Sequence, residues 1–226
     1  MRRKLLAFLV VLGALLVMAA QCPFDPDLPD PGPGPEPDPT PTPGEIMFFD
    51  DFNNGVSSSF GLSSGTWEEV GGEIHPLTDD ASAFVTVGDS WTDYEASADF
   101  RYDDLEDLGH SSRRGLAVRV NGQRKVVFWG TSGKMWFDEY QPDEAPYRKR
   151  MGNSVNEPMP LVCSVRVRVS GNRFQAFVND VLILEAEDAN NRYPSGTTGI
   201  EVHDDHSWED AAEKSFFDNF LVRELE

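Results

Sequence analysis

The chain has 226 residues, of which 39% are hydrophobic and 11% aromatic, so it is able to bury a hydrophobic core. Its formal net charge of −20 makes nucleic acid and anionic membrane surfaces unfavourable partners, because like charges repel. Of the two cysteines, only Cys163 lies beyond the N-terminal region, so no disulfide is expected within the folded part.

Residues 1–21 have the pattern of a secretory signal. Three basic residues precede an apolar run over residues 5–20, which is shorter than the roughly 20 residues that span a bilayer. The sequence "VMAAQC" resembles the lipobox of bacterial lipoproteins, which implies a diacylated Cys22. Gln21 departs from that pattern, so ordinary cleavage after a signal peptide stays the alternative. We expect an exported protein, anchored in a bacterial membrane and facing the periplasm or cell surface, or else secreted.

Residues 22–44 form an acidic linker with proline at nearly every second position. Proline fixes φ and lacks a backbone N–H, so neither helix nor sheet is expected there. Such a segment favours polyproline II, which rises about 3.1 Å per residue and acts as a semi-rigid spacer. The sequence therefore predicts a stalk followed by one domain over residues 45–226.

The domain shows the two-residue period of β-strands and almost no helical period. In "DYEASADFRY", residues 93–102, aromatic and alanine residues alternate with charged and polar ones. A tight turn at Asn179 and Asp180 joins two strands in "RFQAFVNDVLILEA". Further strands are expected in "FFDDF" (48–52), "AFVTV" (83–87), "GLAVRV" (115–120), "KVVFW" (125–129), "KMWFDEY" (134–140), "CSVRVRVS" (163–170), "GIEVHD" (199–204) and "FFDNF" (216–220). About eleven or twelve short strands, with one possible helical turn in "HSWEDAAEKS" (206–215), predict an all-β, two-sheet antiparallel jelly-roll sandwich.

The order of several short motifs resembles the concanavalin A-like, or laminin G-like, jelly-roll family from Ile46 to Leu225. These motifs are "DDF" in the first strand, "GTW" followed by a Gly-Gly turn, "WTDYE" before a long strand, the hairpin "RVSGNRFQAFVNDVL" and the final "FFDNFLV". The most similar branch is bacterial and includes 3-keto-disaccharide hydrolase-like domains. The resemblance implies that the first and last strands are antiparallel neighbours. We expect "FFDDF" and "FFDNF" to match because both strands then pack on one core.

The resemblance also implies a structural calcium ion near the paired ends of the domain. Calcium binds about six to eight oxygen ligands, mostly carboxylates, carbonyls and water. The candidate ligands are Asp50 or Asp51 together with Asp218, with carbonyls near residues 71–72 as helpers. The alternative is that these acids only mark strand ends.

The middle strands carry side chains suited to holding a glycan on the concave sheet. Aromatic rings stack on the C–H faces of sugars, while carboxylates, imidazole and arginine bond to hydroxyl groups. Trp136, Asp138 and Tyr140 share one face by the two-residue period, which leaves Met135 and Phe137 for the core. This pattern predicts an exposed Trp136 ring.

Other candidates for the glycan face come from neighbouring strands. Trp129 lies on "KVVFW", and Glu201 and His203 lie opposite the apolar residues of the late strand. The resemblance implies that Arg119 closes its strand and faces the concave surface. The alternative is that the tryptophans are core residues, which is common in sandwiches. The basic stretch over residues 148–150 is expected in a solvated loop.

Catalysis has no recognised motif in this sequence. Laminarinase-type hydrolases on this fold carry E-x-D-x-x-E on one strand, which is absent here, and the four histidines form no H-E-x-x-H motif. The leading hypothesis is a surface-displayed, non-catalytic domain that binds an oligo- or polysaccharide. One alternative is a glycoside hydrolase or polysaccharide lyase with an atypical site around Glu201, His203 and Asp138. The other is an adhesion or structural module of the envelope without a sugar ligand.

Overall fold

The computed structural model describes residues 44–78, 80–88, 90–103, 113–203 and 214–225. The predicted signal, Cys22 and the linker up to residue 43 lie outside the described residues, as does most of the "HSWEDAAEKS" segment. Within the described ranges, no helix combines the length and apolar character that a membrane crossing requires.

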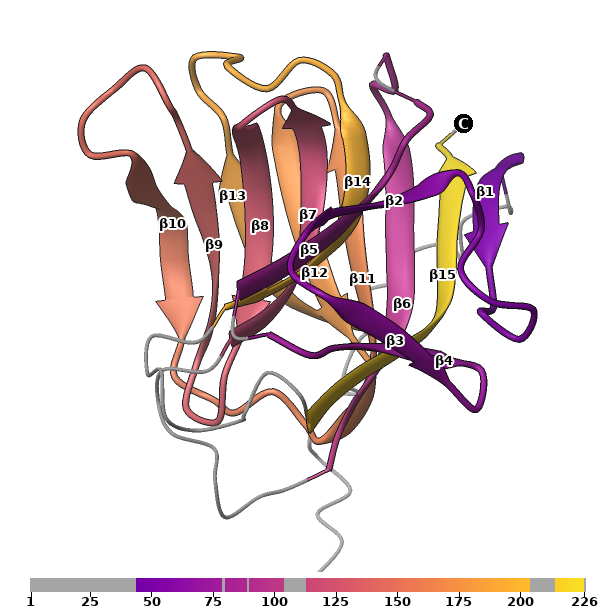
Figure 1. The fold of residues 1–226 in the computed structure, drawn as a ribbon. Helices are drawn as coiled ribbons and strands as arrows, with labels where there is room; N and C mark the ends of the chain where they lie inside the picture. The colour runs from indigo at the N-terminus through magenta and orange to yellow at the C-terminus, as the bar shows by residue number, and fades with distance from the viewer. Residues whose placement is uncertain (1–43, 79, 89, 104–112, 204–213, 226) are drawn as a thin grey trace, which may run out of the picture. The chain divides into compact units, whose positions relative to one another are not determined.

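The described residues form fifteen strands in two sheets, and every strand pair is antiparallel (Figure 1). The eight-stranded sheet has the order β13-β12-β11-β6-β15-β4-β3, and β1 also pairs with β15. The seven-stranded sheet has the order β10-β9-β8-β7-β14-β5-β2. The strands of the first sheet are β1 (Ile46–Asp50), β3 (Trp67–Val70), β4 (Glu73–Pro76), β6 (Tyr94–Tyr102), β11 (Val162–Ser170), β12 (Arg173–Val178), β13 (Val181–Glu187) and β15 (Ser215–Glu224). Those of the second are β2 (Phe60–Ser64), β5 (Asp80–Val85), β7 (Arg113–Asn121), β8 (Arg124–Gly130), β9 (Met135–Tyr140), β10 (Arg148–Val155) and β14 (Thr197–His203). The prediction of an all-β, two-sheet antiparallel sandwich is confirmed.

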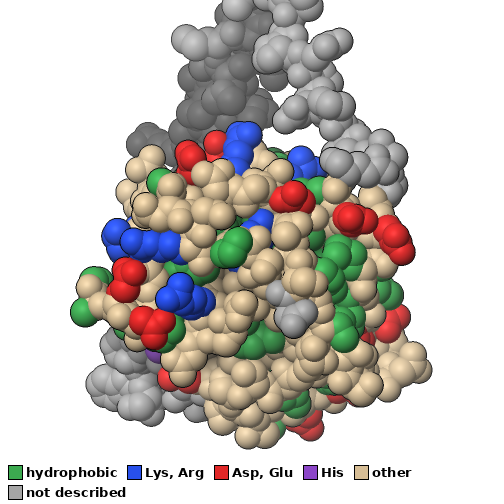
Figure 2. Space-filling model, turned by 90° about the horizontal axis from the view of Figure 1, so that it is seen from above, with side chains coloured by type: hydrophobic (Ala, Val, Ile, Leu, Met, Phe, Trp, Pro, Cys, Tyr) green, Lys and Arg blue, Asp and Glu red, His purple; other side chains and the backbone are tan. Residues whose placement is uncertain are grey.

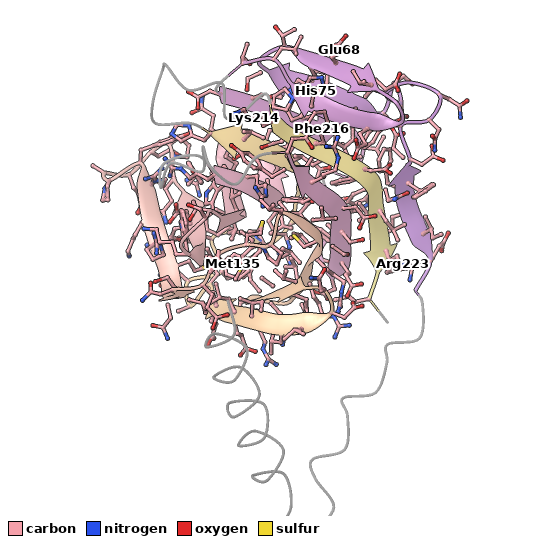
Figure 3. All side chains as sticks on the ribbon, turned by 90° about the horizontal axis from the view of Figure 1, so that it is seen from below. Glu68, His75, Met135, Lys214, Phe216 and Arg223 are labelled. Carbon is pink, nitrogen blue, oxygen red and sulfur yellow. The ribbon has the colours of Figure 1, made fainter. Side chains whose placement is uncertain are left out.

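The main core lies between the two sheets and is built by alternate residues of their strands. On β6, Tyr94, Ala96 and Ala98 are buried while the residues between them are half-buried or exposed, as the two-residue period predicts. Residues of the seven-stranded sheet such as Phe128 and Phe137 face this core. In Figure 3, Met135 lies among the side chains that fill the space enclosed by the strands.

The predicted hairpin and the predicted pairing of the first and last strands are both present. Asn179 and Asp180 have φ values of 50° and 63° and join β12 to β13, as expected for a two-residue turn. β1 pairs antiparallel with β15, with Phe49 opposite Leu221 and Asp50 opposite Phe220. These pairings hold the two ends of the domain together.

The strands that the sequence analysis did not predict are short or lie at a sheet edge. β3 and β4 have four residues each, too few for a period to be read from the sequence. β10 is the edge strand of the seven-stranded sheet, and its residues 148–150 are exposed. The basic stretch is therefore a strand and not the solvated loop that was expected. The core covers an edge strand only in part, so fewer of its positions need apolar residues, and lysine and arginine commonly protect such edges.

Candidate functional site

The face of the seven-stranded sheet that points away from the main core carries the candidate site. A separate buried cluster lies on this face and contains Ala117, Val127, Trp129 and Trp136. Next to it is an open pocket of about 420 Å³, within the usual range of about 300–1,000 Å³ for ligand sites. The pocket is lined by Ser64, Asp80, Ala81, Ser82, Lys125, Trp129, Tyr140, Tyr147, Arg148, Glu201, Val202 and His203.

The strand register places Trp129 and Glu201 in one row across the sheet. Glu201 pairs with Gly115 on β7, Gly115 pairs with Trp129 on β8, and Trp129 pairs with Trp136 on β9. A Cβ atom at position 115 would lie 2.6 Å from Cε3 of Trp129, so glycine makes room for the indole ring. The row thus contains the Glu201 carboxylate, then Gly115, and then the indole rings of Trp129 and Trp136.

An ion pair between Lys125 and Glu201 crosses the pocket. Nζ of Lys125 donates to Oε1 of Glu201, and it also lies 5.0 Å from the ring centroid of Tyr140. Glu201 is 5% exposed, and its burial raises the pKa of the carboxyl group, although Lys125 opposes the shift. The pocket therefore contains a carboxyl group that holds its proton to higher pH than an ordinary glutamate.

A second acid–base pair lies at the edge of the pocket. Nδ1 of His203 contacts Oδ1 of Asp80 across the β14–β5 pairing, and both side chains reach solvent. Because both residues line the pocket, they offer a donor and an acceptor for ligand hydroxyl groups.

Two tyrosines and an arginine form the opposite edge. The ring centroids of Tyr140 and Tyr147 are 5.7 Å apart in an edge-to-face arrangement, and Tyr147 is 48% exposed. Burial, with Glu201 and Asp138 nearby, raises the pKa of Tyr140 to about 12, so the phenol keeps its proton at neutral pH. Arg148 follows Tyr147 at the start of β10 and also lines the pocket.

The structure brings four of the predicted glycan-face residues into this pocket: Trp129, Tyr140, Glu201 and His203. Trp136 and Asp138 lie on the same face but do not line the pocket. The expectation of an exposed Trp136 ring is wrong, because the side chain is only 3% exposed. Lys134 and Arg150 lie 4.9 Å and 4.7 Å from its ring centroid and cover it. The period identified the correct face but not the side chains that cover it.

Asp138 is bound by arginines of β10. Its Oδ1 accepts a hydrogen bond of 3.1 Å from Nε of Arg150, and its Oδ2 lies 3.6 Å from Nε of Arg148. The carboxylate is 3% exposed, so these two arginines cover it from solvent.

Arg119 does not join the predicted group. Its φ of 53° turns the residue at a bulge of β7, and its side chain is 1% exposed. The guanidinium donates hydrogen bonds to the carbonyl oxygens of Tyr193, Thr92 and Gly171, and the backbone N–H donates to the Tyr94 hydroxyl at 2.7 Å. Arg119 therefore ties together loops at one end of the sandwich instead of facing a ligand.

The three calcium candidates all accept local backbone hydrogen bonds. The carboxylate of Asp50 bonds to the N–H groups of Phe52 and Ser57 at 2.9 Å and 2.8 Å, which fixes the turn after β1. Asp51 and Asp218 accept from N–H groups one or two residues further along. In the part of the chain that the structure describes, no group of three or more acidic, histidine or cysteine side chains is placed to hold a metal ion. The calcium site stays a prediction from the sequence.

Sequence reasoning missed Lys125, Asp80, Tyr147 and Arg148, which all line the pocket. Lys125 had a usable signal, since it precedes Trp129 by four residues on one strand and must share its face. Tyr147 and Arg148 had no such signal. Tyr147 lies in a loop and Arg148 begins an edge strand, and neither segment shows the two-residue alternation from which a face could be predicted.

The Glu201 carboxyl predicts a pH dependence of stability. Its pKa in the folded protein lies above the ordinary 4.5, so its contribution is present below pH 4.5 and is lost as the pH rises through the raised pKa. Compared with Glu201→Gln, the wild type should lose free energy of unfolding as the pH increases from 4.5. Urea unfolding of both proteins over a pH series measures this difference. If the unfolding free energy of the wild type minus that of Glu201→Gln stays constant or increases with pH, the raised pKa of Glu201 is contradicted.

Comparisons with known proteins identify the fold. No protein-family model and no curated protein matches the sequence. A carbohydrate-binding module, CBM66 from Bacillus subtilis, aligns with a TM-score of 0.59 and 16% identity over 73% of this chain and 95% of that chain. A Bacillus licheniformis beta-glucanase aligns with a TM-score of 0.53 and 13% identity, covering 81% and 99% of the two chains. The fold is a jelly-roll sandwich.

The jelly roll by itself does not select a function. A Bacillus subtilis protein of unknown function with a galectin-like fold has a TM-score of 0.60 at 10% identity, over 81% of this chain and 97% of that chain. The similar structures thus include a binding module, an enzyme and a protein without an assigned activity. At such identities the likeness shows the fold, and the ligand must be argued from the residues of this pocket.

Proposed function

We propose that this domain is a non-catalytic carbohydrate-binding domain whose pocket on the seven-stranded sheet holds an oligo- or polysaccharide. The observation that carries the proposal is one open pocket that combines aromatic rings with paired polar groups. Tyr140 and Tyr147 offer ring surface at one edge, while Glu201 with Lys125 and His203 provide donors and acceptors within bonding reach of a ligand in the pocket.

Display at the cell surface is the second part of the proposal. A signal ending at a lipidated Cys22 and a proline-rich linker over residues 22–44 would hold the domain away from a bacterial membrane. A binding domain benefits from this placement because a stalk lets it reach polymers outside the envelope.

Tyr147 provides the test, because it is exposed and its removal leaves the core intact. Binding of a panel of soluble polysaccharides is measured by isothermal titration calorimetry with the full chain. Tyr147→Ala should weaken the binding of the polysaccharide that responds by about tenfold, as expected when a stacked ring is lost. Phe49→Ala is the matched control, since Phe49 is 52% exposed and lies on β1 of the other sheet. A panel without any binder, or equal affinities of Tyr147→Ala and the wild type, would overturn the proposal.

A glycoside hydrolase is the second candidate function, and the buried Glu201 is the observation that favours it. A carboxyl group with a raised pKa is the usual general acid in such enzymes, and Asp80 lines the same pocket as a possible second carboxylate. Tyr140, with a pKa of about 12, is poorly suited to abstract a proton as a lyase base. Release of reducing ends by the wild type but not by Glu201→Gln would establish the enzyme and reject the non-catalytic proposal.

A further inference from the structure

We propose that the saccharide bound here is acidic, and that Arg148 binds its carboxylate or sulfate group. The inference rests on the proposed function, because it names the ligand class of the same pocket. It follows from a group of cations on β10 and just before β9, which we call the basic strip and define as Lys134, Arg148 and Arg150. Figure 2 shows Lys and Arg side chains gathered toward the side of the molecule on which β9 and β10 lie in Figure 1.

The basic strip contrasts with the chain as a whole, which carries a formal net charge of −20. Two of its three cations share a single carboxylate, that of Asp138. Lys134 is exposed and forms no ion pair with any described residue. The strip therefore has cations in excess of acids, in a protein where acids outnumber bases by 39 to 19.

Arg148 is the member of the strip that reaches the pocket. Its side chain is 42% exposed, and its Nε atom lies 3.6 Å from Asp138, beyond hydrogen-bond distance. Arg150, in contrast, donates a hydrogen bond to the same carboxylate at 3.1 Å. The Arg148 guanidinium is thus oriented by Asp138 but keeps its donors for a ligand, and its planar fork matches a carboxylate or sulfate.

The ring of Tyr147 is a stacking surface for the sugar that carries the acidic group. Tyr147 precedes Arg148 in the chain, is half exposed and lines the same pocket. A pyranose stacked on this ring would bring a substituent toward the guanidinium. On the opposite edge the acids Glu201 and Asp80 already face Lys125 and His203, so that edge suits neutral hydroxyl groups.

The competing explanation is that the cations of β10 only protect a sheet edge against pairing with other chains. Lys149 separates the two explanations. It lies between Arg148 and Arg150, is 64% exposed, and points to the other side of the strand, where it is 3.9 Å from Glu139. Edge protection would need Lys149 as much as Arg148, whereas ligand binding needs Arg148 alone.

The experiment uses pairs of polymers that differ only in acidic groups: polygalacturonate with its methyl ester, and dextran sulfate with dextran. Titration calorimetry of the full chain at about 0.15 M salt limits unspecific attraction, because the Debye length is then about 8 Å. We expect the acidic member of at least one pair to bind at least about tenfold more tightly than its neutral partner. Arg148→Gln should remove this preference, and Lys149→Gln should retain it.

Three other outcomes would each reject part of the proposal. If only neutral polymers bind, in these pairs or in a wider neutral panel, the acidic ligand is rejected while the proposed binding function stands. If no polymer binds, the proposed function fails and the inference fails with it. If Lys149→Gln loses the preference as much as Arg148→Gln, the attraction is a general charge effect and the assignment of Arg148 is wrong. Thermal melting of both variants shows that they are folded, since neither side chain is buried.

Discussion

Replacing Arg119 with methionine should lower the free energy of unfolding by about 3–5 kcal/mol, because it leaves one buried and two partly buried carbonyl groups without their donors. The guanidinium holds the carbonyl oxygens of Tyr193, Thr92 and Gly171, which come from three different segments of the chain. Methionine retains the length of the side chain but supplies none of these hydrogen bonds. Urea denaturation followed by tryptophan fluorescence measures the loss.

The control for this prediction is Arg124→Met. Arg124 is also on the seven-stranded sheet, but its side chain is exposed and pairs with the exposed Asp143, so unfolding should be unchanged within error. The Arg119 variant should still bind the polysaccharide of the wild type at a temperature where it is folded. Normal stability together with lost binding would instead identify Arg119 as a ligand residue, as the family resemblance implied.

The second large effect is expected from Phe217→Ala, at about 3–5 kcal/mol of unfolding free energy. Phe217 is fully buried, and its ring centroid lies 4.9 Å from that of Phe100 in an edge-to-face contact. The neighbours of Phe217 belong to paired strands, so they can fill the cavity left by alanine only in part. For a domain of this size the melting temperature should fall by roughly 2–4 °C per kcal/mol.

The matched control is Phe49→Ala, because Phe49 and Phe217 occupy the same position in "FFDDF" and "FFDNF". Phe49 is 52% exposed, so its removal should change the free energy of unfolding by less than about 0.5 kcal/mol. Equal losses in the two variants would contradict the structure. Equal losses are also the result that the similarity of the two words alone would predict.

The segments "FFDDF" and "FFDNF" show which structural features a five-residue sequence pattern cannot predict. The words were expected to match because both strands pack on one core, and the strands are indeed paired. However, the second phenylalanine faces outward in β1 and inward in β15. A bulge between Asp218 and Leu221, where Asn219 has a φ of 50°, shifts the alternation within β15. Five letters cannot show a bulge, because it depends on how the partner strand pairs.

The sequence also predicted which residues of β9 lie on the glycan face, but not which of them are exposed. A period of two placed Trp136, Asp138 and Tyr140 on one side of β9, and the structure confirms that Met135 and Phe137 belong to the core. The period could not show that Lys134 and Arg150 cover Trp136 while Tyr140 stays at the pocket. Arg150 arrives from β10, which has no alternation of its own from which its position could be predicted.

The sequence by itself determined the all-β sandwich and the core-facing side of strands with unbroken alternation, such as β6 and β9, because strand alternation is a local property of the backbone. It also determined the turn at residues 179–180, where two neighbouring residues adopt positive φ. Only the tertiary structure decided which residues are covered on the outer face of the seven-stranded sheet. It placed Glu201 beside Lys125 and turned Arg119 away from the pocket. These outcomes depend on strands distant in the sequence, since register and sheet order, and not the local period, decide which side chains meet.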